Sequence, residues 1–252
     1  MQLPKIRTAV ILAAGLGTRL GDKTEHQPKG FLEIDGQSLI ERSIQKLIEV
    51  GMERVVIGTG YLHHFFDRLK HKYHQIETCR SPIFAETGSM YTLYNARDLL
   101  EEDFLLLESD LLYDKLGLNE ILSDQRPDVI LGSGFTKSDD EVFIEADEKH
   151  HLINMSKKRE ELNSIYAELV GINKISFETF QIMCQYCEKI YETDKSIHYE
   201  DAFVGISTVK DIFIKKLPDY AWCEIDDENH LRRALELVYP KILASEKGAE
   251  AS

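Results

Sequence analysis

A glycine-containing turn directly after an apolar strand restricts most strongly how this chain can fold. Residues 8–12 read Thr-Ala-Val-Ile-Leu, and residues 13–19 read Ala-Ala-Gly-Leu-Gly-Thr-Arg. A continuous apolar run is typical of a parallel strand buried on both faces. Two glycines one residue apart permit a sharp turn whose N–H groups bind phosphate, and a helix starting near Thr18 would add its positive end. The pattern indicates a phosphate-binding loop with Arg19 at its end, although an ordinary strand-to-helix turn also fits.

Short apolar runs alternate with helical patterns through the first half of the chain. The periodicity predicts a helix over 39–50, with Ser38 and Glu41 as a capping box and Gly51 as its stop. Further strands are expected at 54–58 and 104–107, and a further helix at 87–100. This alternation predicts βαβ units and a mostly parallel sheet.

The pattern changes in the second half. We expect a hairpin from 142–146 and 152–155, a long strand over 165–175, a helix over 177–192, a short strand over 220–225 and a helix over 227–243. The predicted fold class is therefore α/β: a Rossmann-like three-layer fold with a mostly parallel mixed sheet and a small inserted β-hairpin subdomain. The polar segment 245–252 is expected to be a disordered tail or linker.

Composition excludes several classes of protein. The chain has 252 residues, 43% of them hydrophobic, and a formal net charge of −14. Phosphate backbones require clustered Lys and Arg, so we expect no nucleic-acid partner. No apolar run reaches the roughly 20 residues that span a bilayer, and residues 1–10 lack a secretory signal, which predicts a cytoplasmic protein without a membrane partner. Cys184 and Cys187 form a C-x-x-C inside the helix expected at 177–192, where we interpret them as core thiols.

The glycine turn and a following Pro-Lys resemble a known fingerprint. The string LAAGLGTRL at 12–20 precedes PKGFLEI at 28–34, and this order and spacing resemble the N-terminus of the sugar-nucleotidyltransferase-like superfamily, which includes MobA-like NTP transferases. The resemblance implies a Mg²⁺-dependent nucleotidyltransferase in which Arg19 and Lys29 are catalytic and contact phosphate. Many relatives have Pro-Leu or Ala-Leu after the lysine, whereas this chain has Gly30-Phe31, which would reshape the acceptor end of the site.

Acidic residues follow two of the expected strands. Asp110 lies just after the run 104–107, where ligands bind in open α/β sheets, and a carboxylate there suits Mg²⁺. The resemblance implies a metal-binding aspartate at this position and a partner from Glu224-Ile225-Asp226-Asp227. It points to Asp226 as the second ligand. Asp227 remains an alternative and would equally cap the following helix.

The segment 86–90, Glu-Thr-Gly-Ser-Met, resembles one that lies against the pyrimidine in cytidylyltransferases. Ser89 is then a base contact, although a helix N-cap is an equal alternative. The predicted nucleotide-binding residues are Leu12, Ala14, Gly15, Gly17, Thr18, Gly88 and Ser89.

Acceptor binding is assigned to residues of the second half. Glu168 and Asp201 lie near aromatic residues, a combination that suits a cationic ammonium group, and exposed carboxylates without a role are the alternative. In choline-type relatives a similar aromatic-acidic segment occupies the position of 199–201. Lys157 would meet the phosphorus oxyanion of the acceptor, or would be a surface charge.

Four stretches spread over the chain, at 16–34, 86–93, 108–114 and 199–202, most resemble 2-aminoethylphosphonate cytidylyltransferases. The resemblance implies transfer of CMP from CTP to this amino-phosphonate. Choline-phosphate cytidylyltransferases and sugar-phosphate nucleotidyltransferases remain alternatives. The expected partners are CTP and a small amino-phosphonate or amino-alcohol phosphate. We expect one nucleotidyltransferase domain over 1–244, with a nucleotide-binding half (1–135) and an acceptor-binding half (136–244). A homodimer and a fused or partner aminotransferase domain remain open.

Overall fold

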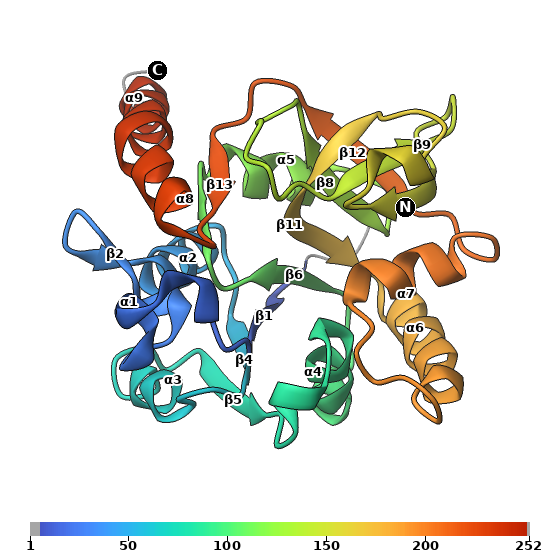
Figure 1. Cartoon of the computed structure of the whole chain (residues 1–252), viewed down its shortest axis with the longest axis horizontal. Coiled ribbons are helices and arrows are strands. Elements are labelled where there is room, and N and C mark those ends of the chain that lie inside the picture. The colour runs from blue at the N-terminus through green and yellow to red at the C-terminus, as the bar shows by residue number, and fades with distance from the viewer. Residues whose placement is uncertain (1–5, 251–252) are drawn as a thin grey trace.

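The computed structural model describes residues 6–250, and its centre is a mixed sheet (Figure 1). The sheet has nine strands among the described residues, and the path β10-β9-β11-β6-β1-β4-β5 is extended by β8 and β12, with β8 paired to β11 and to β12. Its strands are β1 (Thr8–Ala13), β4 (Arg54–Thr59), β5 (Ile76–Arg80), β6 (Phe104–Glu108), β8 (Val129–Ser133), β9 (Phe143–Ala146), β10 (Leu152–Ser156), β11 (Ala167–Ile175) and β12 (Phe213–Leu217).

The parallel part of the sheet comes from the first half of the chain. β1 pairs in parallel with β4 and β6, and β4 pairs in parallel with β5. β11 runs antiparallel to its neighbours β6, β8 and β9. Two small ribbons stand apart: β2 (Glu33–Ile34) with β3 (Gln37–Ser38), and β7 (Leu111–Tyr113) with β13 (Trp222–Glu224). The second ribbon joins the segment after β6 to the C-terminal part of the chain, and so positions acidic residues from both.

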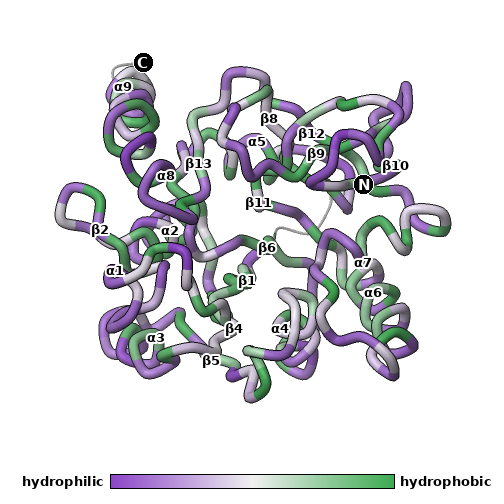
Figure 2. Tube along the Cα trace, in the orientation of Figure 1, coloured by the Kyte–Doolittle hydropathy of each residue, from purple (hydrophilic) through white to green (hydrophobic). Residues whose placement is uncertain are grey.

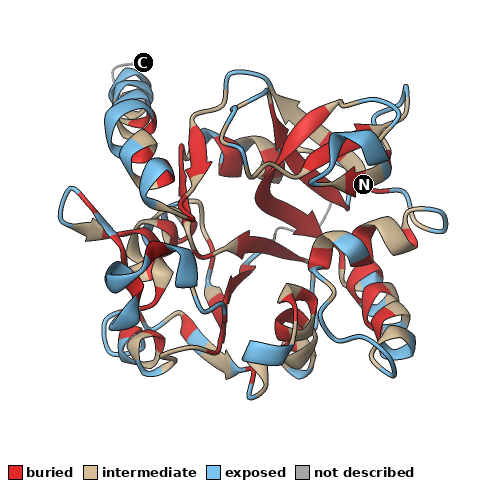
Figure 3. Cartoon of the chain, in the orientation of Figure 1, coloured by how far each residue is buried: buried red, intermediate tan, exposed pale blue. Residues whose placement is uncertain are grey.

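Helices cover both faces of the sheet, which gives three layers. One face packs against α4 (Ser89–Asn95), α6 (Phe177–Ile190) and α7 (Tyr199–Ile206). The other face packs against α2 (Leu39–Glu49), α3 (His64–Leu69) and α5 (Leu116–Ser123). Because β1 is buried on both faces, all six of its residues are apolar or small. Burial concentrates on the central strands (Figure 3), and hydrophobic residues gather on β1 and β4 (Figure 2). The predicted α/β three-layer fold is confirmed.

Local signals placed several elements correctly. Ser38 caps α2, because its hydroxyl accepts a hydrogen bond from the Glu41 backbone N–H, and Gly51 ends the helix with a positive φ of 94°. The expected hairpin is β9–β10. Cys184 and Cys187 are buried free thiols in the hydrophobic core, as interpreted.

Three expectations about helices were wrong. No long helix begins at Thr18: a 3₁₀ turn (Thr18–Leu20) is followed by the short α1 (Asp22–Glu25), so little helix dipole reaches the loop. The helix expected at 87–100 starts at Ser89 and ends at Asn95. Residues 245–250 of the segment expected to be a disordered tail or linker are helical and belong to α9 (Tyr239–Glu250), which follows α8 (Glu228–Arg233) and a π-helical turn (Ala234–Val238). Residues 251–252 lie outside the described residues. Lys46 ion-pairs with Glu246 at 3.0 Å and helps to hold α9 on the domain.

Candidate active site

A cavity opens at the carboxyl ends of β1 and β6, where ligands bind in open α/β sheets. Its volume is about 360 Å³, which falls in the range of small-molecule sites. Residues from both halves of the chain line it. The sequence-predicted residues among them are Leu12, Ala14, Gly15, Gly17, Arg19, Lys29, Gly88, Ser89, Asp110, Lys157 and Asp226.

Lys29 lies at the centre of the charged groups. Its ammonium nitrogen is 2.5 Å from Asp110 Oδ2 and 3.7 Å from Glu224 Oε1, and it also forms an ion pair with Asp226. Burial opposes the charge on Lys29, but these carboxylates outweigh it and raise the pKa of the ammonium above its ordinary value. Lys29 is therefore a permanent cation held among strand-end acids.

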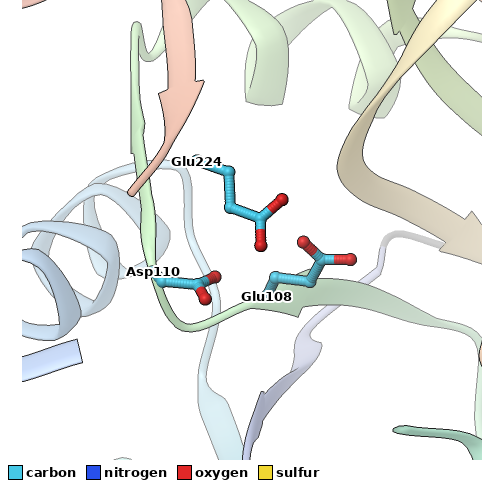
Figure 4. A group of neighbouring side chains, drawn as sticks. All are labelled: Glu108, Asp110 and Glu224. Carbon is cyan, nitrogen blue, oxygen red and sulfur yellow. The ribbon is translucent and has the colours of Figure 1, made fainter. Parts of the chain in front are cut away.

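Three carboxylates converge beside this lysine (Figure 4). Oxygens of Glu108, Asp110 and Glu224 lie within 4.8 Å of one another. Burial, followed by the charges of Glu200 and Asp110, raises the pKa of Glu108 to about 8, and burial also raises the pKa of Glu224. Tyr199 donates a hydrogen bond to Glu108 Oε1 at 2.5 Å. Mutual repulsion and burial thus disfavour ionisation of all three groups at once, and Lys29 supplies a positive charge to Asp110 and Glu224.

Asp226 and Asp227 have different environments. Asp226 is 3% exposed, it lines the cavity, and its Oδ2 has no hydrogen-bond partner among the described residues. Asp227 caps α8 by accepting a hydrogen bond from the His230 backbone N–H at 2.8 Å. The structure therefore places Asp226 at the site and gives Asp227 a helix-capping contact.

Three predicted residues do not line the cavity. Thr18 begins the 3₁₀ turn next to it. Glu168 is 2% exposed and accepts a hydrogen bond from the Thr136 backbone N–H at 2.7 Å. Asp201 forms the capping box of α7 by accepting from the His198 backbone N–H at 2.7 Å. The preceding residue, Glu200, does line the cavity, and its Oε2 is buried without a partner among the described residues.

Gly88 and Ser89 join the two halves of the chain. The Gly88 N–H donates to Lys195 O at 2.9 Å, and the Ser89 hydroxyl accepts from the Tyr199 N–H at 3.1 Å. A Cβ on Gly88 would lie 2.1 Å from Ile197 O. The Ser89 hydroxyl thus contacts the start of α7, in addition to lying at the cavity wall.

The sequence reasoning did not select Glu108, Glu224, Asp140 or Glu200. A signal existed for the first two: Glu108 is the last residue of β6 and Glu224 the last of β13, so each lies at a strand end, two residues before Asp110 or Asp226. Asp140 lies in an acidic loop with no regular pattern. It is found only from its ion pairs with Arg19 and Lys157, both at 2.6 Å.

Part of the chain resembles known nucleotidyltransferases in sequence, and nearly all of it resembles them in fold. Residues 9–128 match the model of the MobA-like NTP transferase domain. The matched segment is just under half of the 252-residue chain. The chain is 34% identical over 113 residues to a choline-phosphate cytidylyltransferase of Streptococcus pneumoniae, covering 45% of this chain and 49% of that protein. It is 33% identical over 105 residues to a 2-aminoethylphosphonate cytidylyltransferase of Lancefieldella rimae, covering 41% of this chain and 43% of that protein.

The matches to these relatives span less than half of their lengths. A solved structure of an inositol-1-phosphate CTP transferase from T. maritima superposes on this chain with a TM-score of 0.82 at 19% identity. That alignment covers 96% of this chain and 98% of the other. The shared fold therefore extends beyond the matched family segment to almost the whole chain.

Proposed function

We propose that this protein is a cytidylyltransferase that transfers CMP from CTP to 2-aminoethylphosphonate, with CMP-2-aminoethylphosphonate and pyrophosphate as products. The observation that carries the proposal is the interleaving of Arg19, Lys29 and Lys157 with strand-end carboxylates in one cavity. Transfer to a phosphonate brings two anions together, so the reaction requires cations fixed around the reacting groups.

Different basic residues would bind the nucleotide donor and the phosphonate acceptor. Arg19 and Lys29, with the N–H groups of the 15–17 loop, would bind the triphosphate and the developing charge on pyrophosphate. Lys157 comes from the end of β10, on the side of the acceptor half, and would bind the phosphonate oxygens. A phosphonate is already ionised at neutral pH, so positioning and charge stabilisation replace a strong general base.

The residues fit a divalent metal ion. The buried Oδ2 of Asp226 lacks a partner among the described residues, and hard carboxylate oxygens are the ligands that Mg²⁺ takes. Asp110 and Asp226 would hold the ion, which supplies positive charge to the phosphate oxygens when bound. Lys29 forms ion pairs with both carboxylates and supports their orientation.

The amino group of the acceptor would bind near Glu200. Its Oε2 is buried without a partner among the described residues, and Glu108, hydrogen-bonded to Tyr199, is its neighbour in the cavity wall. A primary ammonium has three N–H donors and fits paired carboxylates, whereas a trimethylammonium has none. This difference favours the amino-phosphonate over choline phosphate. Glu200 thus takes the place of Glu168 and Asp201 as the proposed ammonium contact.

A direct test measures pyrophosphate release from each nucleoside triphosphate with a panel of acceptors: 2-aminoethylphosphonate, choline phosphate and hexose 1-phosphates. We expect the highest kcat/KM with CTP and 2-aminoethylphosphonate, and loss of activity when a chelator removes Mg²⁺. A preference for choline phosphate or for a sugar phosphate with another triphosphate would contradict the proposed acceptor. Absence of transfer from every triphosphate would contradict the proposed activity.

A further inference from the structure

One carboxylate joins two cations that come from opposite halves of the chain. Asp140 Oδ2 lies 2.6 Å from Arg19 Nη1, and Asp140 Oδ1 lies 2.6 Å from Lys157 Nζ. Arg19 follows the glycine turn after β1, whereas Lys157 follows β10. All three side chains line the cavity. The two cations are therefore held at a fixed separation by a group that is not itself suited to bind an anion.

The fold holds Asp140 in place. Its loop connects β8 to β9 and is anchored at Thr136, whose N–H donates to the buried Glu168 at 2.7 Å, and at Ser138, whose carbonyl contacts His230 Nε2 at 2.8 Å. Burial disfavours the charge of Asp140, but Lys157 and Arg19 outweigh it and lower the pKa of the carboxyl to about 2. The carboxylate is thus ionised at any working pH and does not act as a proton donor.

We propose that Asp140 is a positioning residue that sets Arg19 and Lys157 relative to each other, so that the triphosphate and the acceptor oxyanion meet in one orientation. The inference rests on the proposed function, in which Arg19 binds the donor and Lys157 binds the acceptor. Arg and Lys have long, flexible side chains, and a shared carboxylate removes much of their freedom before either substrate arrives. A misplacement of about 1 Å can lower a rate roughly a hundredfold.

This role predicts a specific kinetic pattern. Asp140 is negative and lies close to two bound anions, so its charge disfavours binding while its geometry favours reaction. In the Asp140→Asn variant we expect kcat to fall by about tenfold to a hundredfold, while the KM values for both substrates stay the same or decrease. A residue with a merely structural role would instead lower the amount of folded enzyme, without this split between kcat and KM.

The neighbouring aspartate gives a matched control. Asp139 is exposed, has no ion pair with the described residues, and has a positive φ of 71°, which asparagine tolerates. Asp139→Asn removes the same charge one residue away, and we expect wild-type kcat and KM. Asp140→Glu keeps the charge but lengthens the side chain, so its kcat should lie between those of wild type and Asp140→Asn.

Two results would overturn the inference. The first is a wild-type kcat in folded Asp140→Asn. The second is a crystal structure of that variant in which Arg19 and Lys157 keep their wild-type positions. This structure needs no substrate, so it decides the role of Asp140 even if the wild-type enzyme transfers CMP to none of the acceptors. Absence of CMP transfer by the wild-type enzyme would contradict the proposed function, but it would not show whether Asp140 positions the two cations.

Discussion

Lys29 and Asp110 form a 2.5 Å ion pair that joins the segment after the glycine turn to the end of β6. Gly30 makes this approach close: a Cβ at position 30 would lie 3.0 Å from the backbone oxygen of Ser109 and 3.5 Å from the side chain of Ile40. Gly30, where this chain differs from many relatives, therefore packs against the backbone of the segment that carries Asp110. The lysine and the aspartate are positioned by the same packing contact.

Lys29→Met should abolish most nucleotidyl transfer. The variant loses a partly buried charge that the proposed function places at the reacting phosphates, and loss of one such contact costs about 2–4 kcal/mol, or roughly a hundredfold or more in rate. Pyrophosphate release measures the effect, with circular dichroism to check folding. Lys23→Met is the matched control, because Lys23 makes an exposed ion pair with Glu228 at 3.1 Å. Equal activity of the two folded variants would refute the role of Lys29.

Asp226→Asn and Asp227→Asn should differ sharply although they change adjacent residues. Asp226 would lose a carboxylate oxygen of the proposed metal site, so Mn²⁺ affinity measured by calorimetry in the presence of CTP should fall about tenfold or more. Asn replaces Asp well as a helix N-cap, so Asp227→Asn should keep both the Mn²⁺ affinity and the melting temperature. If Asp227→Asn loses more Mn²⁺ affinity than Asp226→Asn, then Asp227 and not Asp226 is the metal ligand.

Glu200→Gln should raise the KM for the amino-phosphonate selectively. A charge-assisted contact to ammonium contributes about 1.5–3 kcal/mol, which corresponds to roughly a tenfold to hundredfold increase in KM, while the KM for CTP should not change. Asp201→Asn is the control: it weakens the capping box of α7 and should lower stability by about 1 kcal/mol without changing either KM. If Asp201→Asn raises the KM for the acceptor and Glu200→Gln does not, Asp201 and not Glu200 binds the ammonium group.

Gly88→Ala should destabilise the fold, because the new methyl group would meet Ile197 O at 2.1 Å and Ser196 O at 2.2 Å. Overpacking of this kind costs about 1–3 kcal/mol, which urea unfolding can measure. Gly15→Ala adds the same group where nothing lies within 4 Å, so its unfolding free energy should stay close to wild type. Identical unfolding curves for Gly88→Ala and wild type would show that segment 195–197 shifts without cost.

Much of the central architecture could be predicted from local patterns. The apolar run of β1, the cap of α2 at Ser38 and the buried run of β6 depend on neighbours in sequence, and each occurs where expected. The loop after β1 and Asp110 were found because strand ends in a parallel sheet meet at one edge. Lys29 was found only because its Pro-Lys segment resembles the nucleotidyltransferase fingerprint. The helix expected after Thr18 was wrong because the pattern did not show that the chain forms only a 3₁₀ turn there.

The sequence by itself determined the positions of β1, β4, β6 and β9 to β11, the glycine turn and the candidate residues after β1 and β6, since these follow from hydrophobic periodicity and local turn chemistry. It did not predict β5, β8 or β12, or the order of the strands in the sheet. Only the tertiary structure decided that Glu200 and not Asp201 faces the cavity, because the orientation of α7 against the sheet selects one side of the helix. The structure also decided that Asp140 joins Arg19 to Lys157. The Arg19–Asp140 contact spans 121 residues of sequence, and it forms because two separate strand ends converge on one loop.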